Sequence, residues 1–72
     1  MSRLPVLSGT ELVSRLRRFG YDVDRQTGSH IILRRRDPPH KRLSIPNHRT
    51  LAKGALRVIL RHAELHVEDM AD

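Results

Sequence analysis

Residues 26–48 read QTGSHIILRRRDPPHKRLSIPNH, and this stretch decides the fold. Two short runs within it, residues 30–35 and 41–45, have the composition of β-strands and are bounded by residues that favour turns. The Thr-Gly-Ser sequence at 27–29 is typical of a turn before the first run. A second turn falls at 37–40, because its two prolines cannot donate hydrogen bonds to a strand ladder. The stretch therefore predicts a β-hairpin preceded by another turn.

Alternation along these two strands separates an apolar face from a polar face. The residues of apolar parity are Ile31, Leu33, Leu43 and Ile45. His30 and Arg34 share the other parity of the first strand with Ile32. If helices cover the apolar face, His30 and Arg34 point outward from the opposite face of the sheet.

The segment upstream of the hairpin begins with a helix signal. Ser8-Gly9-Thr10-Glu11 has the pattern of a capping box, in which a serine hydroxyl and a glutamate side chain satisfy each other's backbone N–H groups. Apolar residues then follow at helical spacing until Gly20, which is suited to end a helix. We therefore expect a helix from Gly9 to Phe19.

A strand is expected between this helix and the turn at 27–29. From Tyr21 to Gln26 the period changes to two, with Tyr21, Val23 and Arg25 on one parity. This alternation predicts a half-buried strand that pairs with residues 30–35.

The segment downstream of the hairpin predicts a second helix. A polar connection at 47–53 precedes a helix that starts at Gly54 and fades near Leu65. Its apolar stripe consists of Leu56, Ile59, Leu60 and Ala63. Residues 66–72 are acidic, and we expect this tail to be frayed.

The order α-β-β-β-α predicts an α+β fold, with a three-stranded antiparallel sheet and two helices on one face. With 72 residues, the chain has room for a single domain, 1–72, whose core we place at about 8–65.

The charge of the chain predicts a polyanionic partner. Lys and Arg number 14 against 8 Asp and Glu, and residues 63–72 hold four of those acids and no Lys or Arg. The remaining part is thus strongly basic, as in domains that bind nucleic acid, although an acidic protein would also suit it. The absence of cysteine excludes disulfides and thiolate zinc sites, and we expect a cytoplasmic protein without a signal peptide or membrane span.

Four motifs in this order resemble the HicA-type (YcfA-like) toxins of bacterial toxin–antitoxin systems. They are Phe19-Gly20-Tyr21, Gly28-Ser29-His30, Ile45-Pro46-Asn47-His48 and Lys53-Gly54-Ala55-Leu56 with the following Ile59-Leu60. The resemblance covers roughly residues 8–65. It implies a double-stranded-RNA-binding-domain-like fold. It also implies a metal-independent endoribonuclease that cleaves mRNA as single-stranded RNA and needs no small-molecule cofactor. It also implies inhibition by a HicB-type antitoxin, and it places the catalytic histidine at His30.

The residues around His30 fit this chemistry. A histidine exchanges protons near neutral pH, so it can act as base or acid in RNA cleavage. Gly28 lets the backbone approach a phosphate closely, and the turn amides near Ser29 can contact an anion. The residues expected to bind RNA phosphates are Arg34, Arg35, Lys41, Arg42 and Lys53. The identity of a second acid–base group is left open, with His48 as the first candidate and His40 as the second. The alternative for His48 is a supporting role in the connection before the second helix.

Two other functions remain open from the sequence. One is an RNA-binding module without catalysis, gripping RNA through phosphate and 2′-OH contacts. The other is a protein-interaction domain whose basic face binds an acidic partner. A metal site is disfavoured, because His62 and His66 have helical spacing but no third ligand accompanies them.

Overall fold

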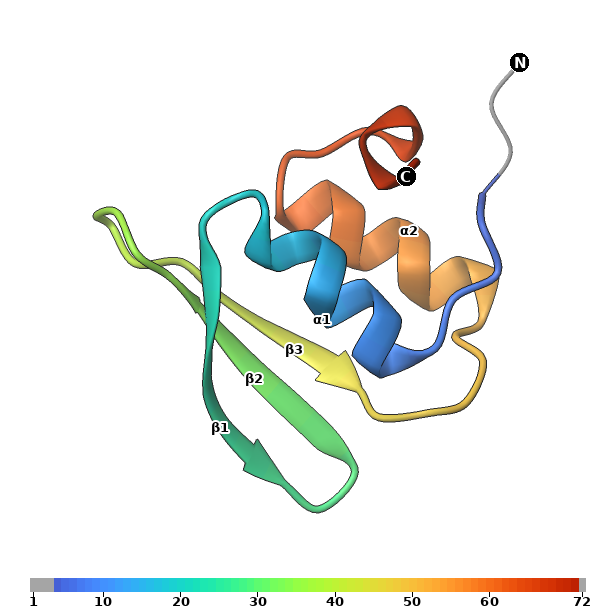
Figure 1. The fold of residues 1–72 in the computed structure, drawn as a ribbon, viewed down its shortest axis with the longest axis horizontal. Coiled ribbons are helices and arrows are strands. Elements are labelled where there is room, and N and C mark those ends of the chain that lie inside the picture. The colour runs from blue at the N-terminus through green and yellow to red at the C-terminus, as the bar shows by residue number, and fades with distance from the viewer. Residues whose placement is uncertain (1–3, 72) are drawn as a thin grey trace.

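The chain folds in the predicted α-β-β-β-α order, with a three-stranded antiparallel sheet and two helices on one of its faces (Figure 1). The computed structural model describes residues 4–71. Its elements are α1 (Gly9–Arg17), β1 (Tyr21–Thr27), β2 (His30–Arg35), β3 (Arg42–Pro46), α2 (Lys53–His62) and a short 3-10 helix, η1 (Val67–Met70). The strand order is β1-β2-β3, so β2 is central and the other two strands form the edges.

The hydrophobic core lies between the helices and the face of the sheet that they cover, which we call the inner face. Ile31 pairs with Ile45 and Leu33 with Leu43, and all four side chains are buried. The buried side chains that the two helices contribute are Leu12, Val13, Leu16, Leu56, Ile59 and Leu60. The predicted apolar parity is therefore confirmed. The opposite face carries no helix, and we call it the outer face (Figure 1).

The predicted capping box at the start of α1 is confirmed. The Ser8 Oγ accepts from the Glu11 N–H at 3.1 Å, and the Glu11 Oε1 accepts from the Ser8 N–H at 2.9 Å. This bond to the Ser8 N–H holds the pKa of Glu11 below its usual range. At its other end α1 stops at Arg17, two residues before the predicted Phe19, whose side chain still packs partly against the core.

β1 does not keep the strict alternation that its sequence predicts, because it contains a β-bulge at Asp24. Val23 pairs with Leu33 and Arg25 pairs with Ile32, so one extra residue of β1 lies between two successive pairs. Val23 stays on the inner face with Leu33, whereas Arg25 lies on the outer face with Ile32. The prediction that Arg25 shares a face with Val23 is therefore wrong, since the bulge reverses the parity.

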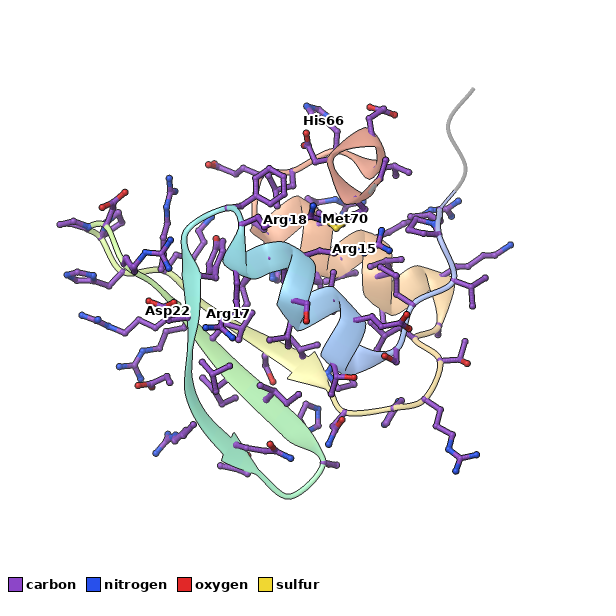
Figure 2. The ribbon with its side chains drawn as sticks, in the orientation of Figure 1. Arg15, Arg17, Arg18, Asp22, His66 and Met70 are labelled. Carbon is purple, nitrogen blue, oxygen red and sulfur yellow. The ribbon has the colours of Figure 1, made fainter. Side chains whose placement is uncertain are left out.

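The C-terminal segment packs against the helices instead of fraying. Met70 in η1 is fully buried, and the Arg15 guanidinium of α1 donates a hydrogen bond to its carbonyl oxygen (Figure 2). The Asp69 carboxylate accepts from the His66 N–H at 2.8 Å and closes the first turn of η1. The prediction of a frayed tail at 66–72 is wrong for residues 66–71, because one apolar side chain finds a place in the core. Asp72 lies outside the described residues.

Candidate functional site

A two-residue turn places His30 at the first position of β2. Thr27 pairs with His30, so Gly28 and Ser29 form the whole connection between β1 and β2. Gly28 has a φ of +46°, a conformation that side chains disfavour, although open space surrounds the position where a Cβ would lie. The glycine thus permits the tight reversal that brings Ser29 and His30 to one end of the sheet.

The His30 imidazole is exposed, and its one hydrogen-bond neighbour among the described residues is the adjacent serine. Its Nδ1 lies 3.2 Å from the Ser29 Oγ, and this contact leaves Nε2 accessible to a ligand. If the serine donates to Nδ1, Nε2 carries the proton and can donate a hydrogen bond to a ligand. If Nδ1 donates to the serine, Nε2 has a free lone pair and can act as a base. The imidazolium that forms on proton uptake can then return the proton as an acid.

Backbone hydrogen bonds tie this turn to the connection after β3 and to the start of α1. The Asn47 N–H donates to the Ser29 carbonyl at 2.7 Å, and the Gly9 N–H donates to the His48 carbonyl at 2.9 Å. A Cβ on Gly9 would collide with the Pro46 carbonyl, so only glycine allows this close approach. Three segments that are distant in sequence thus hold the His30 end of the sheet together.

His48 contributes to this arrangement through its backbone. Its carbonyl accepts from Gly9, and its exposed imidazole makes no hydrogen bond within residues 4–71. The other candidate, His40, lies in the β2–β3 turn at the opposite end of β2, with its Nδ1 3.2 Å from the Arg35 carbonyl. The structure therefore brings the backbone of His48, but not His40, to the His30 end of the sheet.

The side chains of the outer face form three cross-strand rows. From the β1–β2 turn onward, these rows are Thr27–His30–Pro46, Arg25–Ile32–Ser44 and Asp22–Arg34–Arg42. Successive rows are about 7 Å apart, because a strand rises about 3.3 Å per residue. Arg34 and Arg42 therefore lie about 13 Å from His30, too far to hold the same phosphate group. Arg25 lies only one row away.

Two aspartates form ion pairs with arginines at the third-row end of the sheet. Arg36 forms an ion pair with Asp22 at 2.7 Å, and Arg42 forms a longer one with Asp24 at 3.8 Å. These side chains are largely exposed, so each pair contributes little to stability and its arginine can exchange its partner for a phosphate. Arg34 makes no ion pair with another described residue, which leaves its guanidinium available.

Arg35 has a different environment from the other predicted phosphate ligands. It pairs with Tyr21, whose side chain is in the core, so Arg35 lies on the inner face and is half-buried. Its Nε and the Tyr21 hydroxyl are both buried without a hydrogen-bond partner within residues 4–71. Burial raises the pKa of the Tyr21 hydroxyl, although the nearby Arg35 charge opposes this. The structure thus separates Arg35 from the outer face.

The two predicted lysines lie near opposite ends of α2. Lys41 donates from Nζ to the His62 carbonyl at 2.5 Å, and Lys53 is exposed at the first position of the helix. The predicted site residues are therefore spread over the His30 end, the far end of the outer face and the ends of α2.

No group of three or more His, Cys, Asp and Glu residues that could hold a metal ion occurs within residues 4–71. His62 closes α2 and His66 precedes η1, so these two histidines do not share a helix. The helices in the same range are also too short or too polar for any of them to cross a membrane.

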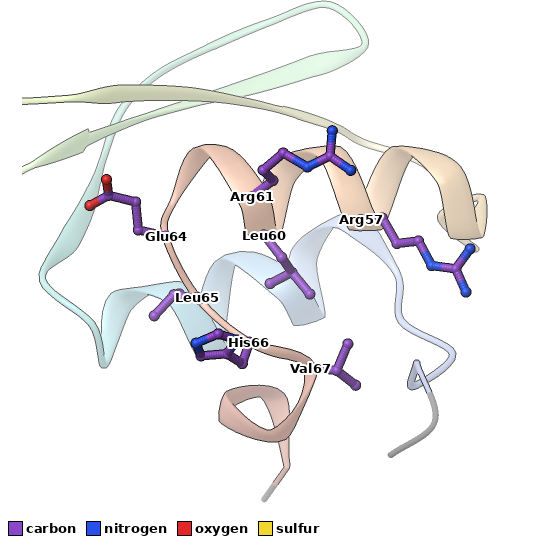
Figure 3. Close-up of a pocket in the computed structure, with 7 residues that line it drawn as sticks. All are labelled: Arg57, Leu60, Arg61, Glu64, Leu65, His66 and Val67. Atoms are coloured by element: carbon purple, nitrogen blue, oxygen red, sulfur yellow. The ribbon is translucent and has the colours of Figure 1, made fainter. Parts of the chain in front are cut away.

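A shallow hollow lies between α2 and the C-terminal segment, away from His30 (Figure 3). It is lined by Arg57, Leu60, Arg61, Glu64, Leu65, His66 and Val67. This hollow contains none of the residues that the sequence predicts for the catalytic site.

The sequence reasoning missed Arg25 as a residue of the outer face. The parity of β1 placed it with Val23, and only the bulge at Asp24 brings it next to the row of His30. A single strand sequence gives no clear signal of such a bulge, because the extra residue is defined by the pairing with β2.

Comparison with known proteins identifies one family. Residues 9–65 match the family described as the HicA toxin of bacterial toxin–antitoxin systems. This match covers both helices and all three strands. No curated protein is significantly similar to the chain.

Proposed function

Since the chain belongs to the HicA toxin family of bacterial toxin–antitoxin systems, we propose that it is an endoribonuclease that cleaves mRNA and is neutralised by a HicB-type antitoxin. The observation that carries the proposal is the exposed His30 imidazole, whose Nδ1 lies beside the Ser29 hydroxyl. This contact orients the ring and leaves Nε2 open to a substrate on the outer face.

The proposed reaction uses the ribose 2′-OH of RNA as its nucleophile. His30 removes the 2′-OH proton through Nε2, and the resulting oxygen attacks the neighbouring phosphorus. The bond from phosphorus to the 5′ oxygen breaks, and that oxygen takes a proton from the imidazolium or from water. The products are a 2′,3′-cyclic phosphate and a 5′-hydroxyl. Because the nucleophile belongs to the substrate, no metal-bound water has to be generated.

Arg25 supplies positive charge for this step. It is exposed, lies on the outer face one row from His30, and makes no ion pair within the described range. A long side chain reaches a diagonal neighbour on an adjacent strand. Its planar guanidinium can donate to two phosphate oxygens at once while negative charge builds up on them.

The turn backbone offers a second source of stabilisation. Gly28 has no side chain to block a phosphate, and the backbone at Gly28 and Ser29 is at the surface. Arg34 and Arg42 lie about 13 Å away and bind other phosphates of the same RNA.

The direct test is cleavage of single-stranded RNA in the presence of EDTA by the wild type and by His30→Ala. We expect the variant to lose about 10²- to 10⁴-fold in kcat, the usual contribution of a general acid–base group. His66→Ala serves as the matched control, because this histidine is also exposed but lies in the C-terminal segment. Mass spectrometry of the products should detect the 2′,3′-cyclic phosphate.

Binding of the same RNA separates catalysis from affinity. We expect wild type and His30→Ala to bind it equally well. Equal cleavage by both proteins would show that His30 is not the acid–base group, whereas binding without cleavage by either would support a non-catalytic RNA-binding module.

A further inference from the structure

Three cations stand at intervals of four residues along the exposed side of α2. We call Lys53, Arg57 and Arg61 the α2 stripe; all three are exposed and none forms an ion pair within residues 4–71. Residues four apart lie on one face of a helix, with a drift of about 40° at each step. The stripe extends over about 12 Å, because a helix rises 1.5 Å per residue.

Glu64 is the acid that lies beside the stripe, since it lines surface hollows together with Arg57 and Arg61. Residues 38–63 include no Asp or Glu, and Glu64 is the first acid beyond α2. The proposed catalytic chemistry at His30 does not use the stripe. The sequence predicted a phosphate contact for Lys53 alone, so Arg57 and Arg61 have no assigned role.

The stripe is continuous with the outer face of the sheet. Arg61 and His62 share a surface hollow with Lys41, which precedes β3, and with Arg42, the first residue of β3 at the edge of the sheet. Glu64 also lines this hollow, where it faces three cations. Lys41 also bonds to the His62 carbonyl and so fixes the end of α2 to this edge. Figure 3 shows Arg61 reaching toward the strands, on the side away from the C-terminal segment.

A single basic path results from this arrangement. It starts at His30, follows the outer face for about 13 Å to Arg34 and Arg42, and turns around the β3 edge at Lys41. From there it follows α2 from Arg61 back to Lys53.

We propose that this path binds the phosphate backbone of one single-stranded RNA, so that the substrate extends for several nucleotides on one side of the cleaved bond. This inference rests on the proposed nuclease function and adds the surface along which the substrate is bound. A duplex does not fit the path, because it would have to bend around the edge of a domain only 32 × 26 × 19 Å in extent. A single strand bends at each nucleotide and can follow both surfaces.

The chemistry of the stripe favours phosphate over a protein partner. The centre of a protein interface is normally poor in charge and rich in aromatic or apolar side chains. The stripe instead presents cations with a rise of about 6 Å between neighbours, and arginine and lysine are frequent ligands of backbone phosphates.

The test compares the wild type with the double variant Arg57→Gln, Arg61→Gln on two substrates. One is a dinucleoside monophosphate, whose single phosphate reaches only His30, and the other is a single strand of about 12 nucleotides, within the range that small single-strand-binding domains cover. We expect the double variant to raise KM for the long strand about tenfold and to leave kinetics on the short substrate unchanged. The slope of log K against log salt for the long strand should fall by about 1.4, since each phosphate contact contributes about 0.7.

The matched control is Arg17→Gln, Arg18→Gln, which removes the same charge from exposed positions at the end of α1, outside the path. It should change the salt slope much less. An unchanged KM and slope in the α2 variant would overturn the proposal, even while His30-dependent cleavage upheld the nuclease function. Loss of antitoxin inhibition with unchanged RNA binding would also overturn it, by assigning the stripe to the protein partner. If the wild type cleaves neither substrate, the proposed nuclease function is contradicted. The salt slope of RNA binding then still tests whether the α2 stripe binds RNA.

Discussion

His30 is positioned by its backbone more than by contacts of its side chain. The imidazole is exposed and touches one hydroxyl, whereas the surrounding backbone is fixed by hydrogen bonds from Asn47 and Gly9 to the Ser29 and His48 carbonyls. This arrangement combines a fixed backbone with an accessible Nε2, which suits the proposed RNA substrate. If the proposal holds, small movements of the connection after β3 should change the rate of cleavage without changing the histidine itself.

Arg25 offers a test of the outer-face geometry at the scale of one residue. We expect Arg25→Ala to lower kcat at least tenfold, because a guanidinium near the phosphate stabilises charge that develops during the reaction. Arg25→Lys should recover only part of the rate, since an ammonium group cannot form the two-pronged contact. Arg17→Ala is the control for loss of a surface arginine. Equal rates for Arg25→Ala and this control would contradict the assignment.

Tyr21 links a buried hydroxyl to the pH dependence of stability. Burial raises the pKa of this hydroxyl above its ordinary value of about 10, so the unfolded chain releases the proton first as pH rises. The free energy of unfolding should therefore fall as pH increases above about 10. Tyr21→Phe should remove this contribution and raise stability below pH 10 by about 1 kcal/mol, since the hydroxyl has no partner among the described residues. Urea titrations of both proteins at several pH values measure the free energy of unfolding. An equal fall of this free energy above pH 10 in both proteins would show that the hydroxyl is not responsible.

At the scale of elements, the bulge in β1 decides which charges lie on the outer face. One extra residue at Asp24 places Arg25 on the outer face and lets the Asp24 carboxylate approach Arg42 across the sheet. A regular strand would have directed Arg25 toward the helices, where its charge would require a partner. As a result, β1 exposes its charged side chains to solvent and buries one side chain, that of Tyr21 at the start of the strand.

The C-terminal segment is a second element that depends on one side chain. Met70 is fully buried, so Met70→Ala should reduce the free energy of unfolding by about 2–5 kcal/mol through the cavity that it leaves. Val6→Ala is the control, because Val6 is 78% exposed and its truncation should be nearly neutral. Chemical denaturation of both variants makes the comparison. A cost below about 0.5 kcal/mol for Met70→Ala would mean that the segment is detached in solution.

At the scale of the whole molecule, the two-layer arrangement places different residue types on the two faces of the sheet. Both helices lie on the inner face, and the outer face keeps a histidine, arginines and aspartates free of any covering element (Figure 1). The C-terminal segment, which contains Glu68 and Asp69, lies beside the helices (Figure 1). A polyanion is therefore drawn to the outer face and the β3 edge, where positive charge predominates.

The sequence by itself determined the order of elements, the apolar parity of β2 and β3, the capping box of α1 and the outward direction of His30. These features depend on local patterns, namely alternation, helical spacing and turn residues, which act within a few positions of the chain. The family could also be inferred from four short motifs, because they occur in the same order as in the family that they resemble.

Only the tertiary structure decided the parity of Arg25, the burial of the Arg35 Nε beside Tyr21 and the burial of Met70. The first depends on a bulge that exists only through pairing with β2, and the second follows from the pairing of Arg35 with the buried Tyr21. The third depends on a contact between Met70 and Arg15, 55 residues apart. Pairing and packing between distant segments fix such features, and no local pattern encodes them.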